Sequence, residues 1–426
     1  MQVIINPDRK DWKEILQRPY IDNSAVVQSV QSILKEVKAN GDEALRRFAK
    51  KFDGVELENF GVTEEEMAAA ANELTPELKA AIQQAKANIE TFHTKQLPDV
   101  EVIETMPGIE CWRKSIGIEK VGLYIPGGTA PLFSTVLMLA IPAKLAGCKK
   151  IILCTPSNKE GKLHSAILYT AQLAGVTEIY KLGGAQAIAA MAYGTDSIPA
   201  VYKIFGPGNQ YVTAAKQAIQ MQGIAIDMPA GPSEVCVLAD ETADPAFVAA
   251  DLLSQAEHGS DSQVLLVSGD LSVVEKVQEE LEKQLQMLPR KDMATKALMN
   301  SKAVVLDKLE DAIALVNEYA AEHLIISYKN AEVIAEQVSN AGSIFIGNYS
   351  PESVGDYASG TNHTLPTNGF AKAYSGVSVD SFVKKVTYQK LSKQGLENIA
   401  ATVIHMAEAE GLDAHANAVK VRLIAQ

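Results

Sequence analysis

The stretch KVGLYIPGGTAPLFSTVLMLAIPAKLAGCKKIILCT, residues 120–155, determines the architecture that we expect. The apolar run at 120–125 predicts a buried strand, Pro-Gly-Gly at 126–128 a turn, 134–146 a helix, and 150–154 a second buried strand. This order of elements is the unit of a parallel sheet with helices packed on its faces. We therefore expect an α/β fold.

The same alternation of strands, turns and helices continues through most of the chain. Strands of a first series are predicted at 120–125, 150–154, 177–181, 201–205 and 224–228. Strands of a second series are predicted at 235–238, 263–267, 303–306, 323–326 and 343–346. Two series of this kind predict two doubly wound, Rossmann-like lobes with parallel sheets and a cleft between them. Helical segments are predicted for the first hundred residues and for 396–426, and an irregular segment for 348–378.

Composition and charge exclude several classes of function. The chain of 426 residues has a formal net charge of -13, which disfavours a nucleic-acid partner because phosphates require a basic surface. The sequence has no signal-peptide pattern at its start and no apolar run long enough to cross a membrane, so no membrane partner is expected. Its four cysteines lack metal-binding or redox spacing, which favours a cytoplasmic location. Cys154 and Cys236 fall in predicted apolar strands, where we expect packing rather than nucleophilic catalysis.

Three glycine-rich turns follow strands of the first series and precede helices. They are Pro126-Gly127-Gly128, Gly183-Gly184-Ala185-Gln186 and Gly206-Pro207-Gly208-Asn209. The last is not a GxGxxG fingerprint, because Tyr211 takes the place of the third glycine. Turns at these positions let phosphates meet helix N–H groups, so three of them predict a nucleotide site at the strand ends. Ordinary tight turns of an α/β domain explain the pattern nearly as well.

Histidines recur beside carboxylates or amides in the C-terminal half. Gln255 and His258 lie three residues apart at the end of a predicted helix, and therefore on one face of its last turn. The pair Glu322-His323 stands where a predicted helix gives way to a strand, a common position for catalytic groups. Taken singly, a histidine at a helix C-terminus and a solvated acid beside a histidine are the simpler interpretations.

Two further segments supply the same kinds of side chain. Asp356 and His363 fall in the irregular segment, and His415 lies in the first turn of a helix capped by Asp413. A polar loop and a capped helix with a surface histidine also explain these segments. Two histidines, one aspartate and one glutamine would together suit zinc or manganese. The ligands are spread from Gln255 to His415, so only the fold can unite them.

Several long motifs are jointly specific. The segments VGLYIPGGTAPLFSTVLMLAIPAKLAGC, KLGGAQAIAA, KIFGPGNQYVTAAK, IDMPAGPSEV, DLLSQAEHGSDSQ, AEHLII, SPESVGDYASGTNHTLPT and AEGLDAHANAV resemble the histidinol dehydrogenase family, in order and over nearly the whole chain from Val121. The resemblance implies oxidation of L-histidinol to L-histidine through L-histidinal in two NAD-dependent steps that end histidine biosynthesis. It also implies one Zn2+ per subunit and a homodimer in which the C-terminal segment of one subunit completes the partner's site.

The resemblance further implies roles for individual residues. Acid–base catalysis falls to Glu322 and His323. The metal ligands would be Gln255, His258, Asp356 and His415. Contacts with the substrate fall to these ligands, to His323, and to Ser233, His363 and Glu410. The NAD contacts would be Tyr124, Gln186 and Asn209.

The expected division of the chain has four parts. They are an N-terminal helical segment at 1–19, a first α/β lobe of 20–120 with 235–377 that carries the metal and acid–base residues, a second α/β lobe of 121–234 with the NAD site, and a C-terminal helical segment at 378–426. In this interpretation the metal holds the imidazole and amine of histidinol, while His323 removes protons and Glu322 activates water. The alternatives are a related dehydrogenase of another polar alcohol such as a sulfonated diol, a metal-dependent hydrolase, and a non-catalytic nucleotide-binding module.

Overall fold

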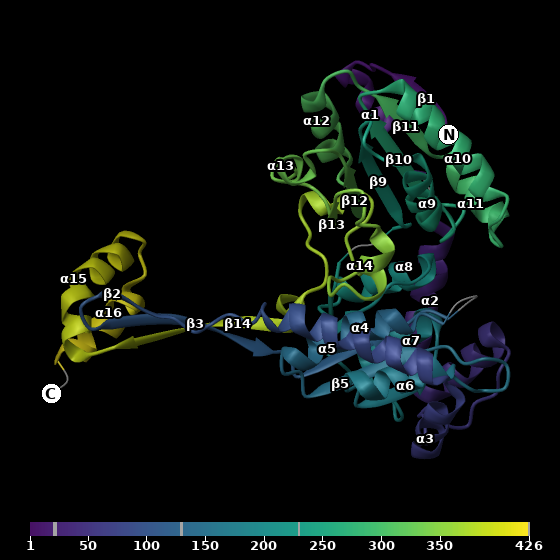
Figure 1. The fold of residues 1–426 in the computed structure, drawn as a ribbon. Helices are drawn as coiled ribbons and strands as arrows, with labels where there is room; N and C mark the ends of the chain where they lie inside the picture. Colours follow the sequence, from purple (N-terminus) through teal and green to yellow (C-terminus); the bar gives the residue numbers. More distant parts are fainter. Residues whose placement is uncertain (20–23, 128–130, 229–230, 425–426) are drawn as a thin grey trace.

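The computed structural model describes residues 1–19, 24–127, 131–228 and 231–424. These residues form two α/β lobes, one above the other in Figure 1, and an arm that projects away from both. No helix in these ranges is both long enough and apolar enough to cross a lipid bilayer.

The upper lobe in Figure 1, here called the six-stranded lobe, is built on six parallel strands. In sheet order they are β1 (Gln2–Ile5), β11 (Lys302–Val305), β10 (Gln263–Ser268), β9 (Glu234–Ala239), β12 (His323–Ser327) and β13 (Ser343–Ile346). One face packs against α9 (Pro245–Ala256), α10 (Leu271–Leu285) and α11 (Lys291–Met299). The other packs against α1 (Trp12–Ile15), α12 (Leu309–Tyr319) and α13 (Ala331–Ala335). Because both faces are covered, the central strands are apolar almost throughout, as the sequence predicts.

The lower lobe, here called the five-stranded lobe, repeats this layered design. Its parallel strands are, in sheet order, β6 (Glu178–Lys181), β5 (Lys150–Thr155), β4 (Lys120–Tyr124), β7 (Lys203–Phe205) and β8 (Ala225–Ile226). One face packs against α2 (Ser24–Phe48), α7 (Gly184–Tyr193) and α8 (Gln210–Gln220). The other packs against α4 (Pro76–Thr94), α5 (Phe133–Leu145) and α6 (Ser165–Ala174), with α3 (Glu64–Glu73) beside α6. The expected α/β class with two parallel sheets is confirmed.

The N-terminal part of the chain is arranged differently from the expected division. The segment at 1–19 contributes a strand as well as helix, because β1 pairs in parallel with β11 at the edge of the six-stranded sheet. The helices α2, α3 and α4 contact α7, α8, α6 and α5, so they belong to the five-stranded lobe rather than to the other one. Val30, Leu34 and Val37 of α2 share a core with Ile152 of β5. An amphipathic helix carries no signal for which sheet it will cover, and this explains the difference.

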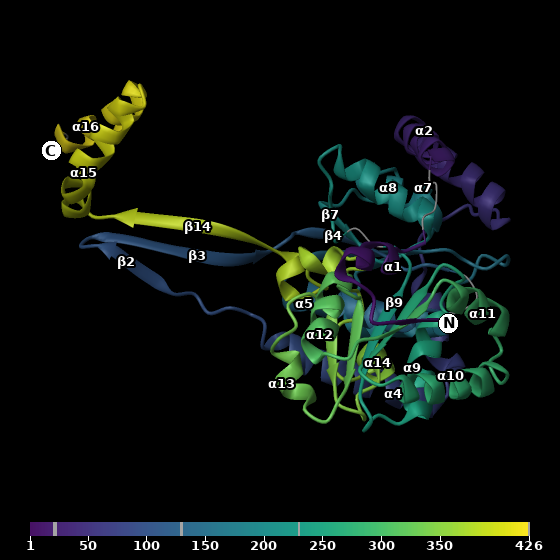
Figure 2. The same cartoon turned by 90° about the horizontal axis from the view of Figure 1, so that it is seen from above.

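The arm is a three-stranded antiparallel sheet followed by two helices (Figure 2). Its strands are, in order, β14 (Val383–Leu391), β3 (Ile109–Gly117) and β2 (Val102–Met106), and its helices are α15 (Lys393–Ala409) and α16 (Asp413–Ile424). The expected helical segment at 378–426 therefore contains a nine-residue strand. Full pairing of β14 with β3, from Val383 opposite Gly117 to Leu391 opposite Ile109, holds the two helices away from the lobes.

Short elements complete the chain. They are η1 (Arg9–Asp11), η2 (Ala49–Asp53), α14 (Glu352–Tyr357), η3 (Phe370–Lys372) and η4 (Val379–Phe382). The segment at 348–378 is mostly irregular, as expected, apart from α14 and η3. It runs along the inner end of the six-stranded lobe, between the two lobes (Figure 1).

Candidate active site

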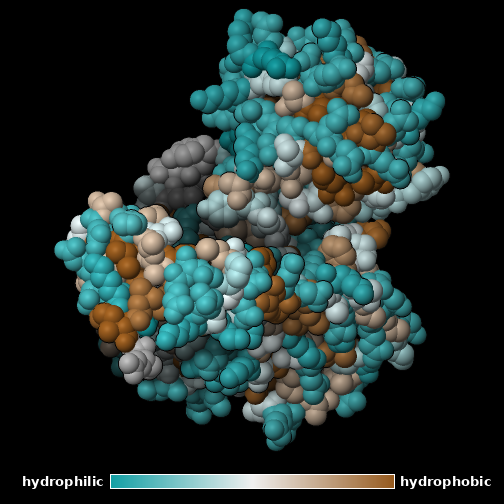
Figure 3. Space-filling model, turned by 90° about the vertical axis from the view of Figure 1, so that its left-hand side faces the viewer, coloured by the Kyte–Doolittle hydropathy of each residue, from teal (hydrophilic) through white to brown (hydrophobic). Residues whose placement is uncertain are grey.

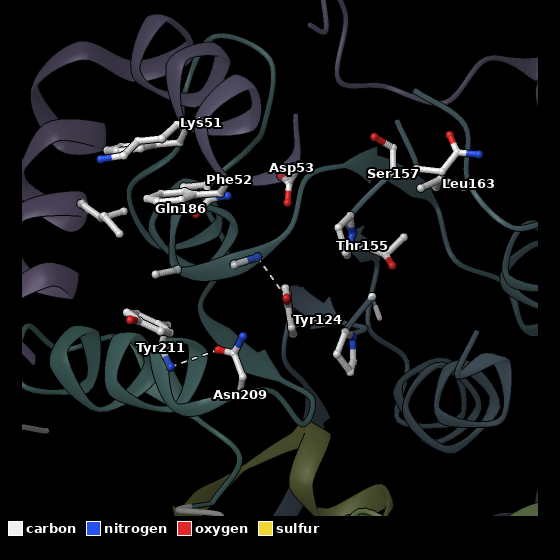
Figure 4. A pocket seen from close by; sticks show the side chains of 18 of the residues that line it. Lys51, Phe52, Asp53, Tyr124, Thr155, Ser157, Leu163, Gln186, Asn209 and Tyr211 are labelled. Atoms are coloured by element: carbon white, nitrogen blue, oxygen red, sulfur yellow. Dashed lines mark hydrogen bonds between the residues drawn. The ribbon is translucent and has the colours of Figure 1, made fainter. Parts of the chain in front are cut away.

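A cavity of about 1210 Å³ opens at the carboxyl ends of the strands of the five-stranded lobe. Tyr124, Gln186 and Asn209, the three expected NAD contacts, all line it (Figure 4). Tyr124 ends β4, Gln186 lies in the first turn of α7, and Asn209 caps α8. The structure therefore brings together three residues that are far apart in the sequence, at the edge of a parallel sheet where ligands usually bind.

Hydrogen bonds fix two of these residues. The Tyr124 hydroxyl accepts the backbone N–H of Gly184 at 3.0 Å, and burial raises the pKa of Tyr124 to about 12, so the phenol keeps its proton. The Asn209 side-chain oxygen accepts the N–H groups of Tyr211 and Val212 at 3.0 and 3.1 Å. Both residues are thereby held at the start of a helix, where the partial positive charge of the helix end favours an anion.

The glycine-rich turns pack too closely for a side chain. A Cβ on Gly206, whose φ is +121°, would lie 2.0 Å from the carbonyl oxygen of Tyr124. A Cβ on Gly127 or on Gly183 would lie within 2.5 Å of Pro156. Tight packing therefore accounts for these glycines. Gly128 of the first turn lies outside the described residues.

A cluster of buried polar side chains lies in the other lobe, at the amino ends of the strands of the six-stranded sheet. His323 is the first residue of β12, and its Nε2 lies 3.2 Å from a carboxylate oxygen of Asp356 in α14. Its Nδ1 lies 3.3 Å from the side-chain nitrogen of Gln255, which belongs to the last turn of α9. Glu322 precedes β12 and points toward the same histidine, with 3.7 Å between a carboxylate oxygen and Nδ1.

The cluster perturbs the acidities of its members. Burial raises the pKa of Glu322, although His323 and the backbone N–H of Glu234 partly offset this effect. Burial lowers the pKa of His323, but the charges of Glu322 and Asp356 outweigh burial and raise it. Buried groups with perturbed acidity are typical of sites for proton transfer. The two residues of the expected acid–base pair therefore lie among buried groups whose pKa values are shifted.

Two more histidines border this cluster. Burial lowers the pKa of His258 and of His363, so both imidazoles favour the neutral form that can bind a metal ion. The Nδ1 of His363 lies 2.7 Å from the backbone oxygen of Asp356, and its Nε2 lies 3.0 Å from the hydroxyl of Thr135 in α5. Pro131, four residues before Thr135, lines the cavity of the five-stranded lobe. The segment around the start of α5 therefore contacts His363 at Thr135 and lines the cavity at Pro131.

The remaining expected site residues divide into two groups. Ser233 immediately precedes β9, so it lies at the same amino edge as the cluster. Glu410 and His415 lie on the arm at the end of α15 and the start of α16, exposed and remote from the cluster (Figure 1). Within the described ranges, no group of three histidine, cysteine or acidic side chains is placed to hold a metal ion. One chain thus assembles Gln255, His258 and Asp356 without His415.

Sequence reasoning missed one member of the cluster, Glu352. It is 1% exposed, its carboxylate accepts a hydrogen bond from Ser254, and its second oxygen has no partner. Burial raises the pKa of Glu352 to about 7. It lies in the segment ESVGDY, residues 352–357, which has no periodic pattern that would indicate burial. Its burial follows from the docking of α14 against α9.

The fold and the site together define a class of protein. Two parallel α/β lobes, a nucleotide-sized cavity at the carboxyl ends of one sheet, and a buried acid–base cluster beside it are features of an α/β oxidoreductase.

Comparisons with known proteins identify the family within this class. The family model described as "Histidinol dehydrogenase" matches residues 16–423. A histidinol dehydrogenase from Bacteroides fragilis is 58% identical over 423 residues, covering 99% of each chain, and one from Xanthomonas campestris pv. campestris is 54% identical over 397 residues, covering 93% of this chain and 92% of the relative. The crystal structure of histidinol dehydrogenase from Elizabethkingia anophelis matches with a TM-score of 0.97 at 54% identity, covering 99% of this chain and 98% of that one. The chain belongs to the histidinol dehydrogenase family.

Proposed function

We propose that this chain oxidises L-histidinol to L-histidine through L-histidinal, with NAD as the hydride acceptor in both steps, as the end of histidine biosynthesis in the cytoplasm. The observation that carries the proposal is the buried cluster of Glu322, His323 and Asp356, together with a separate cavity lined by Tyr124 and Gln186. The first site suits proton transfer and the second suits a dinucleotide. All four cysteines are unpaired, which suits a reducing compartment.

NAD would occupy the cavity of the five-stranded lobe, where it would accept hydride from the substrate carbon. The chain contributes orientation there. The N-termini of α7 and α8 point into the cavity and favour the pyrophosphate, while the protonated Tyr124 hydroxyl is available as a donor.

Zinc fits the residues of the cluster. The side-chain oxygen of Gln255 is buried and has no hydrogen-bond partner, although such an atom normally has one. Burial keeps His258 neutral, whereas His323 and the nearby imidazoles outweigh burial and lower the pKa of Asp356, so it stays ionised. An amide oxygen, an imidazole and a carboxylate are ligands that zinc accepts, and His415 of a second subunit would add the fourth. Bound there, the ion would hold the imidazole and amine of histidinol in a fixed orientation.

His323 would act as the base that takes the hydroxyl proton in each oxidation. The carboxylates of Glu322 and Asp356 stabilise the imidazolium that results, because both lie within 3.7 Å of its ring nitrogens. Glu322 would take a proton from the water that hydrates the aldehyde, since burial raises its pKa toward neutrality. Neither Cys154 nor Cys236 suits the role of a nucleophile, because burial raises the pKa of both thiols far above the physiological range.

A homodimer with shared active sites would explain the arm. The arm carries Glu410 and His415 far from the cluster of their own chain, and it exposes apolar side chains such as Val102, Ile103 and Met406. Figure 3, seen from the side of the arm, shows apolar residues at the arm's surface toward the left. A second subunit that receives the arm would bury these side chains and deliver Glu410 and His415 to the neighbouring substrate site.

Growth of a bacterial strain that lacks histidinol dehydrogenase tests this proposal. We expect expression of the chain to restore growth without histidine, and expression of His323→Ala at the same level to fail. Absence of growth at good expression of the unmutated chain would reject the proposed function. Supplying a sulfonated diol to the purified protein, with NADH absorbance as the readout, checks the alternative substrate and should give no signal.

A further inference from the structure

An ion pair joins the N-terminal segment to the six-stranded sheet next to Glu322 and His323. The guanidinium of Arg18 donates from Nε and Nη2 to the two carboxylate oxygens of Glu234, at 2.5 and 2.9 Å. The Glu234 side chain is 3% exposed and that of Arg18 is 17% exposed. Bidentate pairs of this kind fix geometry as well as charge.

The same guanidinium contacts a second element beside Glu322. Nη2 of Arg18 donates at 2.7 Å to the backbone oxygen of Tyr319, the last residue of α12, and the guanidinium stacks on the Tyr319 ring at 4.2 Å. Glu322 follows three residues later, after Ala320, which is held in a left-handed conformation with φ at 53°. Arg18 therefore joins the start of β9 to the turn that leads into Glu322.

The backbone of Glu234 contacts both residues of the acid–base pair. Its N–H donates to a carboxylate oxygen of Glu322 at 2.9 Å, and its carbonyl oxygen lies 3.4 Å from Nδ1 of His323. Ser233, an expected substrate contact, is the preceding residue. A shift of the Glu234 backbone would therefore move a hydrogen bond to each of the two catalytic side chains.

We propose that Arg18 and Glu234 are positioning residues, whose ion pair holds the backbone at 233–234 so that Glu322 and His323 keep their catalytic geometry. The inference rests on the proposed function, because its expected consequence is a change in the rate of histidinol oxidation. Neither side chain needs to touch the substrate. Displacements of about 1 Å in a catalytic site lower rates by about 100-fold, so loss of the pair affects turnover more than binding.

The test uses the full-length protein and three variants of Arg18, with Arg9→Met as the matched control. Arg9 belongs to the same segment but forms an exposed pair with Asp311, so Arg9→Met should leave kcat unchanged. In Arg18→Met we expect kcat for histidinol to fall about 10- to 100-fold with KM within about threefold. Arg18→Lys, which retains the charge but not the planar pair of donors, should recover only part of kcat.

The double variant Arg18→Met/Glu234→Gln separates positioning from stability. Removing both charges relieves the unpaired buried carboxylate, so Tm should return toward that of the unmutated protein while kcat stays low. Recovery of both Tm and kcat in the double variant, or unchanged kcat in Arg18→Met, would overturn the inference. If the unmutated chain gives no turnover with histidinol and NAD, the proposed function itself fails and the inference falls with it.

Discussion

In the five-stranded lobe the cavity lies at the carboxyl ends of the strands, whereas in the six-stranded lobe the acid–base cluster lies at the amino ends. Both sheets have the same internal order, since β4 and β9 each lie between strands that follow them in the chain. Tyr124 ends β4, while His323 begins β12. Similar folds thus carry the cavity and the cluster at opposite edges of their sheets.

The two edges differ in the helix ends that they present. At the cavity, α7 and α8 begin, and their partial positive charge favours the phosphates of a dinucleotide. At the cluster, α9 ends with Gln255 one residue before its last position, and α12 ends with Tyr319 three residues before Glu322. Their partial negative charge favours a metal ion and an imidazolium. In the proposed function, opposite sheet edges would therefore serve an anionic cofactor and cationic chemistry in one active site.

The largest effect is expected for the acid–base cluster itself. His323→Ala should lower kcat by about 100- to 10 000-fold, because it removes the proton acceptor. Binding of histidinol should be largely kept, since the proposed metal ligands remain. Steady-state kinetics with a separate titration of histidinol binding measures the two quantities. A variant with normal kcat would show that the amino edge of this sheet is not the site of proton transfer.

The next effect concerns the metal. His258→Ala should release zinc, and metal analysis of the purified protein should show far less than one ion per chain. His363→Ala is the matched control, because His363 hydrogen-bonds Thr135 and is not a proposed ligand. It should retain zinc and raise KM for histidinol. Equal zinc content in both variants would contradict the proposed ligand set.

Smaller changes are expected at the cavity. Tyr124→Phe removes the acceptor for the Gly184 N–H, a hydrogen bond of about 0.5–1.5 kcal/mol. The KM for NAD should therefore rise by about 2- to 10-fold. The KM for histidinol serves as the internal control and should not change. If the KM for histidinol rose instead, the two edges would not divide cofactor and substrate as proposed.

The smallest effect is expected for the buried thiols. Cys154→Ser should leave kcat within about twofold, because its thiol is fully buried and stays protonated. A modest loss of stability of about 1 kcal/mol is expected from burying a hydroxyl in an apolar core, measurable by denaturant unfolding. Loss of the second oxidation alone would instead indicate a thiohemiacetal route.

Local sequence signals predicted the two series of parallel strands and the residues at their ends. The runs around Tyr124 and His323 are apolar and bounded by turns, so period and length were sufficient. Motifs that resemble a family supplied the roles. Three features needed the fold. The sequence of β14, VKKVTYQKL, has no strict alternation of apolar and polar residues, and the strand pairs with β3, far away in the sequence. Glu352 is buried only by the docking of α14, and Arg18 meets Glu234 across 216 residues.

The stoichiometry of the reaction tests the central claim most directly. Two successive oxidations at one site should release about two NADH for each histidinol consumed, because each NAD accepts one hydride. Measuring NADH absorbance together with the histidine formed gives this ratio. A value near two supports the joint action of the two lobes in both oxidations. A ratio near one, with histidinal accumulating, would contradict it.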